Sequence, residues 1–305
     1  MPVKDAEGAD DELDVSVVLP VYNEVGHVLE EVNRIRAALQ ASPYSFEIIA
    51  VDDCSTDGSL QVLEGIDDIR VIRSAKNRGS GAVRRTGTRA ARGRVVVWTD
   101  ADMSYPNEEI PRLVKELEGY DQVVGARTSE QGRARVFRVP AKWSIRKLAS
   151  YLTDTKIPDL NSGLRAFRRD VGLQYVHMLP SGFSCVTTLT MTFLANGYSV
   201  KYVPIDYSPR AGYSKFHWWT DTRRYFVQVL RMVLTYDPLR IFVPASLVLG
   251  VPGVGKLVYD LVTKDLRIAT NTLLLLFAAL QVLVIGLLAD LVVRLARPSE
   301  FVDPA

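Results

Sequence analysis

The chain has few of the residues that build zinc sites and disulfide frameworks. Its 305 residues include only two cysteines, Cys54 and Cys185, and only three histidines, all far apart in the sequence. That spacing argues against a zinc site and against a disulfide-stabilised scaffold. The formal net charge is only +2, which gives no global indication of nucleic-acid binding. We therefore expect no nucleic-acid partner.

The N-terminus lacks the apolar segment that a secretory signal requires. The first fourteen residues hold six acidic side chains against Lys4 alone, a balance typical of a solvated tail. We expect residues 1–14 to form a disordered acidic tail and the N-terminus to stay in the cytosol.

The average hydrophobic fraction of 48% hides a division near residue 237, beyond which the chain is strongly apolar. Residues 272–289 carry no charge, and this is roughly the length that crosses a hydrocarbon core. Residues 241–262 are a weaker candidate because Pro252 and Gly253 interrupt them. We predict a transmembrane hairpin at residues 237–297, with helices near 241–262 and 270–293, and a tail at 298–305. A buried soluble hairpin is the alternative, but no further domain remains to cover it.

Basic residues flank the predicted hairpin on both sides. Arg231 and Arg240 precede it, and Arg294 and Arg297 follow it, which suits two ends on the cytoplasmic side. The connection also carries Lys264 and Arg267, so the charge bias is modest. We expect a multi-pass protein of the plasma membrane whose catalytic domain is cytoplasmic.

Residues 15–236 alternate between strand and helix patterns. Short β-branched apolar runs occur at residues 15–21, 46–51, 70–73 and 94–99, whereas residues 25–40 and 81–91 have helical spacing. Strands that alternate with helices indicate an α/β fold with a mostly parallel sheet.

Polar clusters follow three of the predicted strands. Tyr22 and Glu24 follow the first, Asp53 follows the second, and Asp100 and Asp102 follow the fourth. Ligands of such sheets bind at the carboxyl ends of strands. Two carboxylates this close repel each other unless a cation or proton lies between them, and Mg²⁺ or Mn²⁺ suits such hard oxygen ligands. A metal there would neutralise charge on a diphosphate leaving group.

Six motifs in one order resemble family 2 of the glycosyltransferases: VSVVLPVYNE, VDDCSTDGS, NRGSGAVRRTG, DADMSYPNEEIPRL, DLNSGLRAF and PRAGYSK. More narrowly, the chain resembles the polyprenyl-phosphate branch, which contains dolichyl-phosphate mannosyl- and glucosyltransferases and bacterial bactoprenol glucosyltransferases. The resemblance covers residues 15–236, and the hairpin also suits that branch. It implies a Rossmann-like GT-A fold and inverting transfer from a nucleotide sugar to a lipid phosphate.

The resemblance also implies roles for individual residues. For nucleotide-sugar binding it implies Pro20, Tyr22, Glu24, Asp53, Arg85 and Asp100. For metal binding and catalysis it implies Asp100, Asp102, Asp159 and Arg165. For the acceptor and its phosphate the resemblance implies Ser162, Arg210, Ser214 and Lys215. We also expect Arg127 and Arg133 there, because the stretch from Arg127 to Lys147 is strongly basic and suits a phosphate- or membrane-facing surface. A basic helix on an ordinary solvated surface is the alternative for that stretch.

The chain departs from the family pattern at three positions. Cys54 stands where glycine is usual, and Ser80 stands where lysine is common. Ser104 takes the place of a glutamine that binds the metal in some relatives, so a hydroxyl or a water would have to serve.

The acceptor implied by the resemblance is a phosphate monoester. Its second pKa is about 6, so near pH 7 it is largely dianionic and needs no general base. We expect Asp159 to orient the sugar or the acceptor rather than to remove a proton.

The predicted activity is transfer of glucose or mannose from a UDP- or GDP-sugar to a polyprenyl phosphate, for cell-envelope glycan or protein glycosylation. The sequence does not separate the two nucleotides, and a homo-oligomer remains open. A processive polysaccharide synthase is one alternative, although Gln228 and Arg231 lack the tryptophan of its Q-x-x-R-W motif. A non-catalytic membrane scaffold is the other.

Overall fold

The computed structural model describes residues 13–128, 150, 155–182, 184–208, 227, 230–231, 233–263 and 267–296. They belong to two compact units that divide between Tyr225 and Phe226. Three of the expected acceptor-side residues, Arg210, Ser214 and Lys215, lie outside the described residues, as does Arg133.

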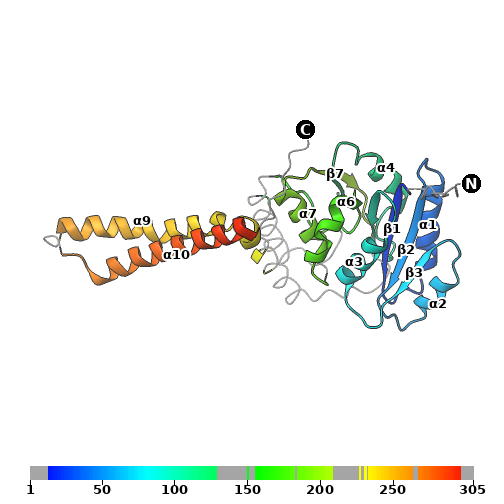
Figure 1. The fold of residues 1–305 in the computed structure, drawn as a ribbon, viewed down its shortest axis with the longest axis horizontal. Helices are drawn as coiled ribbons and strands as arrows, with labels where there is room; N and C mark the ends of the chain where they lie inside the picture. The colour runs from blue at the N-terminus through cyan, green and yellow to red at the C-terminus, as the bar shows by residue number, and fades with distance from the viewer. Residues whose placement is uncertain are drawn as a thin grey trace, which may run out of the picture. The chain divides into compact units, whose positions relative to one another are not determined.

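The described part of the first unit is built on a seven-stranded sheet with the order β3-β2-β1-β4-β6-β5-β7 (Figure 1). Strand β6 runs antiparallel to β4 and β5, and the other neighbours are parallel. The predicted mostly parallel α/β fold is therefore confirmed. The strands are β1 (Val15–Val21), β2 (Phe46–Asp52), β3 (Arg70–Arg73), β4 (Val95–Trp98), β5 (Gln122–Arg127), β6 (Arg165–Arg168) and β7 (Val200–Ile205).

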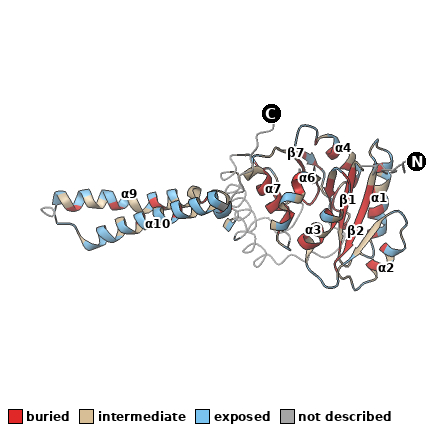
Figure 2. Cartoon of the chain, viewed as in Figure 1, coloured by how far each residue is buried: buried red, intermediate tan, exposed pale blue. Residues whose placement is uncertain are grey.

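Helices cover both faces of this sheet. One face packs against α1 (Val28–Gln40), α2 (Ser59–Glu64) and α4 (Ile110–Lys115). The other packs against α3 (Ser80–Ala90), α6 (Arg169–Tyr175) and α7 (Cys185–Ala195). Two short 3-10 turns, η1 (Asn107–Glu109) and η2 (Val176–Met178), complete the described elements of this unit. Because both faces are covered, the central strands are buried on each side, as their continuous apolar runs indicate (Figure 2).

Helix α3 lies unusually close to the sheet. A β-carbon at Gly87 would collide with the Val18 side chain of β1, so only glycine permits this approach. The close packing brings the buried side of α3 against the middle of the sheet, with Arg84 one turn before Gly87.

The second unit contains two long apolar helices, α9 (Leu239–Thr263) and α10 (Thr270–Ala296), which form a hairpin. Both are long and apolar enough to cross a membrane, and only 11% of the most apolar window of each is buried (Figure 2). A soluble hairpin would cover far more of its apolar surface. Helix α9 continues through Pro244 and Pro252, so the interruption expected at Pro252 does not end it.

The two helices of the hairpin pack through small residues. Gly253 faces Leu276, Gly250 faces Ala279, and Gly286 faces Phe242. Close approach through glycine is common between membrane helices because dispersion contacts take the place of the hydrophobic effect there.

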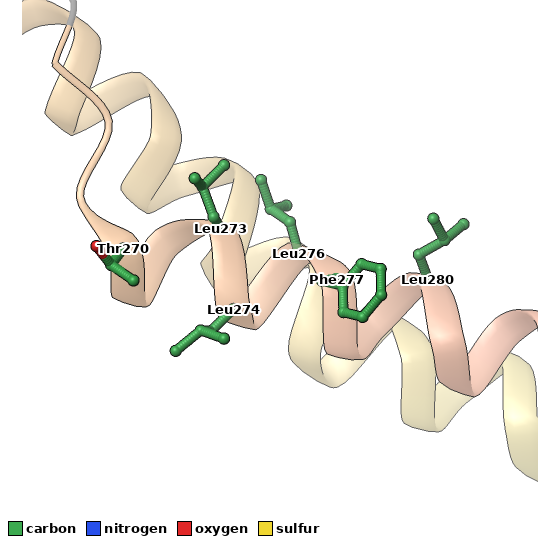
Figure 3. A pocket seen from close by; sticks show the side chains of 6 residues that line it. All are labelled: Thr270, Leu273, Leu274, Leu276, Phe277 and Leu280. Atoms are coloured by element: carbon green, nitrogen blue, oxygen red, sulfur yellow. The ribbon is translucent and has the colours of Figure 1, made fainter.

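The apolar outer surface of α10 holds a shallow pocket (Figure 3). Its lining is almost entirely aliphatic and aromatic: Thr270, Leu273, Leu274, Leu276, Phe277 and Leu280. Such a lining offers no group for sugar or phosphate chemistry and is typical of a surface that faces lipid chains.

Candidate active site

The parallel register brings the ends of β1, β2 and β4 to one edge of the sheet. Val21 pairs with Asp52, and the Asp53 amide donates to the Val21 carbonyl at 2.8 Å. Strand β4 lies on the other side of β1 and runs parallel to it. Tyr22, Asp53 and Asp100 therefore follow neighbouring strands at the same edge.

Each of these three strand ends contains a residue with left-handed backbone geometry. The φ angles are 55° at Asn23, 64° at Cys54 and 61° at Met103. Such conformations cost about 1–3 kcal/mol for non-glycine residues and cluster where function fixes the backbone. The angle at Cys54 also explains why glycine suits this position, since glycine adopts positive φ without strain.

The first two loops of the edge are bound to each other. The Asn23 amide donates to Ser55 Oγ at 3.0 Å, and the Thr56 amide donates to Asn23 Oδ1 at 2.8 Å. The Glu24 amide donates to Ser59 Oγ at 2.8 Å. Pro20, Tyr22 and Glu24 are partly exposed beside these hydrogen bonds, where a ligand can reach them.

Asp53 organises the glycine-rich segment that precedes α3. Its side chain is buried, and its two oxygens accept the amides of Arg78 and Gly79, both at 2.8 Å. The expected contact between Asp53 and the nucleotide base stays a prediction. In this structure the carboxylate fixes the backbone of the neighbouring loop.

Asp100 and Asp102 are held in different ways. Asp100 is 24% exposed and forms an ion pair with the buried guanidinium of Arg84. Burial alone would lower the pKa of Arg84, but the Asp100 carboxylate raises it, so the arginine stays charged. Asp102 is only 4% exposed and accepts the Ser104 hydroxyl.

Arg84 contacts Asp100 of the acidic pair, whereas the expected role of Arg85 in nucleotide-sugar binding stays a prediction. The Arg85 guanidinium donates to the Leu179 carbonyl and, at 3.2 Å, to Ser181 Oγ. Sequence reasoning missed Arg84. The signal was its helical spacing from the small residues Gly81 and Gly87, which marks the side of α3 that faces the sheet.

The oxygen donors of the acidic pair fit a hard divalent cation. Among the described residues, no group of three or more histidine, cysteine or acidic side chains is placed to hold a metal. Mg²⁺ and Mn²⁺ commonly bind through one or two carboxylates and complete their shell with substrate phosphates and water. Asp100 and Asp102 match that arrangement and do not match a closed, all-protein metal site.

The loop that follows Asp159 comes directly against Asp100. A β-carbon at Gly163 would lie 2.7 Å from Asp100 Oδ2, so any larger residue here would push against the Asp100 carboxylate. The Gly163 amide donates to the Tyr105 hydroxyl at 2.6 Å, and burial raises the pKa of Tyr105. Residues 159–163 and the acidic pair thus form one continuous site.

Asp159 is paired with Arg127. Arg127 Nε donates to Asp159 Oδ2 at 2.7 Å, and Nη2 donates to Oδ1 at 2.9 Å. Burial would raise the pKa of Asp159, but the Arg127 fork holds it below its usual range. The guanidinium also lies 5.2 Å from the centre of the Tyr207 ring. A carboxylate held in this way is a poor proton acceptor and a rigid hydrogen-bonding group.

Arg165 and Ser162 are fully buried beneath this loop. The Arg165 guanidinium donates to the carbonyls of Ser162 and Val186, and to Thr190 Oγ1 at 2.9 Å. Burial lowers the pKa of Arg165 to about 10, so it remains charged near neutral pH. Arg165 therefore supports the 159–163 loop from the interior in this structure, and its expected contact with substrate stays a prediction.

Comparison with known proteins identifies both units. Residues 16–173 match the family described as Glycosyl transferase family 2, and residues 237–295 match the GtrB C-terminal hairpin. The chain is 32% identical to an undecaprenyl-phosphate 4-deoxy-4-formamido-L-arabinose transferase of Pseudomonas paraeruginosa, over 95% of this chain and 89% of that protein. The enzyme of the same description from Photorhabdus laumondii is 29% identical, over 95% and 93% of the two chains.

Solved structures share the fold at low identity. Glucosyl-3-phosphoglycerate synthase from Mycobacterium tuberculosis, in complex with Mn²⁺, UDP and glucosyl-3-phosphoglycerate, is 20% identical with a TM-score of 0.56 and covers 72% of this chain and 80% of its own. Mannosyl-3-phosphoglycerate synthase from Rubrobacter xylanophilus is 21% identical with a TM-score of 0.55, and 72% of each chain is covered. With a family match over more than half of its length and a relative at 32% identity over 95% of this chain, the chain belongs to glycosyl transferase family 2 and is a glycosyltransferase that carries a GtrB-type membrane hairpin.

Proposed function

We propose that this enzyme transfers a hexose from a UDP- or GDP-sugar to a polyprenyl phosphate with inversion at the anomeric carbon. The observation that carries the proposal is the acidic edge at Asp100 and Asp102, in a chain that continues into a GtrB-type hairpin. The relatives named as undecaprenyl-phosphate sugar transferases support the acceptor class, although the sugar in their names is not a hexose.

On the donor side, Asp102 and Asp100 would hold a Mg²⁺ or Mn²⁺ ion, and Asp100 would also lie near the ribose or the sugar. The ion supplies positive charge that stabilises the departing nucleoside diphosphate. The Arg84 ion pair restrains Asp100, so the carboxylate does not have to reorganise during the reaction. Pro20, Tyr22, Glu24 and Asp53 would border the nucleotide.

On the acceptor side, an oxygen of the phosphate monoester forms the new bond to the anomeric carbon. The bond from that carbon to the diphosphate oxygen breaks, and the nucleoside diphosphate leaves with the electron pair. Since the acceptor is already charged near pH 7, no proton has to be removed. The Arg127–Asp159 pair fits an orienting role, because the carboxylate is committed to a guanidinium.

The hairpin would keep the active site at the bilayer surface, where the acceptor's phosphate lies. In this proposal residues 15–236 form the cytoplasmic catalytic domain and residues 237–297 span the membrane twice. Basic residues near an anionic surface contribute roughly 1 kcal/mol each, which suits the stretch from Arg127 to Lys147. Arg210, Ser214 and Lys215 would close over phosphate.

The test uses the full-length chain in detergent with radiolabelled UDP-glucose or GDP-mannose and undecaprenyl phosphate. We expect a lipid-extractable product with one sugar, lost on EDTA treatment and restored by Mn²⁺ or Mg²⁺. Asp102→Ala should lower turnover by more than about 100-fold, in the range for lost electrostatic stabilisation of a transition state. The exposed acid Glu118 provides a matched control, and Glu118→Ala should leave turnover unchanged.

Three outcomes would contradict the proposal. Full turnover in EDTA would show that the reaction needs no divalent metal. A polymeric product would indicate a processive synthase. Absence of any sugar–lipid product with either donor, with a folded protein, would contradict the proposed hexose transfer.

A further inference from the structure

The inner face of α1 presents a buried carboxylate toward the acidic loop. Glu31 lies on α1 with its side chain fully buried, although a glutamate is rarely found in such a position without a specific partner. Its neighbours along the helix, Val28, Val32 and Ile35, belong to the apolar core. The hydrogen-bond partners of Glu31 therefore indicate the role of this buried carboxylate.

A chain of buried hydrogen bonds leads from Glu31 to the strand end that carries Asp100. Glu31 Oε1 accepts the side-chain amide of Asn107. Asn107 Oδ1 in turn accepts the Thr99 hydroxyl at 2.6 Å. Thr99 and Asn107 are both fully buried, and Thr99 directly precedes Asp100. The chain thus ends at the backbone of the acidic pair.

Arg34, one turn further along α1, joins the same loop at several points. Its guanidinium donates to the Tyr105 carbonyl at 3.4 Å and to both Glu108 oxygens, at 2.9 and 2.8 Å. Glu31 Oε2 accepts Arg34 Nη1 at 3.2 Å. Glu31 therefore also aims Arg34 at the loop between Asp102 and Glu108.

The electrostatics agree with this geometry. Burial raises the pKa of Glu31 to about 7 against the lowering effect of Arg34, and the charge of Asp102 adds to the rise. An apolar side chain at position 31 would fill the same buried space without the cost of desolvating a carboxylate. Packing alone therefore does not explain the glutamate.

We propose that Glu31 is a positioning residue for the metal-binding carboxylates, acting through Asn107 and Thr99. The proposal rests on the proposed function, since it takes Asp100 and Asp102 as the metal ligands. Glu31 touches neither metal nor substrate. It fixes where β4 ends and so where the two carboxylates point.

The test measures Mn²⁺ binding directly, by electron paramagnetic resonance of free Mn²⁺, on the full chain with UDP or GDP present. Glu31→Ala removes the acceptor for Asn107 and should weaken Mn²⁺ binding about 10-fold. Glu31→Gln keeps an acceptor in the same place and should stay within about 3-fold of the parent. Glu30 is the exposed neighbour on α1, and Glu30→Gln should change nothing.

Thr99→Val removes only the hydroxyl that reaches Asn107, at nearly constant volume. It should weaken Mn²⁺ binding by a similar factor, and it decides the question if Glu31→Ala fails to fold. In turnover assays both variants should raise the Mn²⁺ concentration for half-maximal rate more than they lower kcat at saturating Mn²⁺.

Asp102→Ala separates this inference from the proposed function. If Asp102→Ala abolishes Mn²⁺ binding while Glu31→Ala and Thr99→Val bind Mn²⁺ normally, the positioning role is overturned and the metal site stands. If Asp102→Ala itself binds Mn²⁺ normally, the assignment of the metal site fails. A lower melting temperature in Glu31→Ala with unchanged Mn²⁺ affinity would reduce Glu31 to a structural residue.

Discussion

At the scale of single residues, the Arg127–Asp159 pair separates an orienting carboxylate from a catalytic base. General bases contribute about 10²- to 10⁴-fold to rate, so their loss is large. Asp159→Asn keeps the shape of the side chain and loses its charge. We expect turnover within about 10-fold of the parent enzyme in single-turnover assays, because the acceptor needs no proton removed.

The matched variant is Arg127→Gln, which leaves Asp159 as the unpaired member. Breaking a buried ion pair from either side costs about 3–5 kcal/mol, so both single variants should melt at lower temperature. The double variant should recover part of that loss, since no charge remains unpaired. A drop of more than 10³-fold in Asp159→Asn, with normal folding and substrate binding, would instead make Asp159 the base.

How far the sequence predicted the site depends on how local each contact is. Asp100 and Asp102 follow a buried strand, so the sequence alone places them at the ligand-binding edge. Arg84 of α3 pairs with Asp100, and the helical spacing that separates Arg84 from Arg85 does not say that its partner is Asp100. Glu31 meets Asn107 across 76 positions, a contact that no local pattern encodes.

At the scale of elements, the strands were predicted closely because continuous β-branched runs have few alternatives. The predicted strands at residues 15–21 and 70–73 match β1 and β3 residue for residue. Helix α9 was harder, since Pro252 and Gly253 normally weaken a helix. It continues through both, as neighbouring apolar helices permit, and Gly253 is used for packing against Leu276.

The packing of α9 against α10 gives a prediction with an internal control. Gly286 of α10 faces Phe242 of α9 so closely that an added β-carbon would collide with the Phe242 β-carbon, whereas Gly255 of α9 has open space around it. Gly286→Ala should destabilise the hairpin by about 1–3 kcal/mol through overpacking. Gly255→Ala should be neutral or slightly stabilising, since alanine favours a helix.

The measurement is the thermal stability of helical circular dichroism in detergent micelles, with both variants in the full chain. Equal behaviour of the two alanine variants would show that α10 does not approach α9 at Gly286.

At the scale of the whole molecule, stability depends on pH through two kinds of buried acid: those whose pKa is lowered by folding and those whose pKa is raised by it. Asp159 and Glu47 have pKa values below their usual range, mainly because arginine pairing overcomes their burial. As the pH falls, these groups take up protons at a higher pH in the unfolded chain than in the folded chain. Their stabilisation is therefore present above about pH 4 and is lost as the pH falls through their folded pKa values.

For Glu31, folding raises the pKa instead of lowering it. Its pKa rises from 4.5 to about 7 on folding, so between these values the folded chain holds a proton that the unfolded chain has released. Stability contributed by protonated Glu31 is present below pH 4.5 and is lost as the pH rises toward 7.

These two trends predict a stability maximum near pH 4.5–5 for the catalytic unit in metal-free buffer. Tryptophan fluorescence of the full chain in nanodiscs, heated in EDTA from pH 3.5 to 8, measures the melting temperature. The decline between pH 5 and 7 should disappear in Glu31→Gln, which cannot ionise, and should persist in the exposed control Glu30→Gln. A parent profile that stays flat from pH 5 to 7 would mean that Glu31 is already ionised in the folded chain, and that Arg34 outweighs its burial.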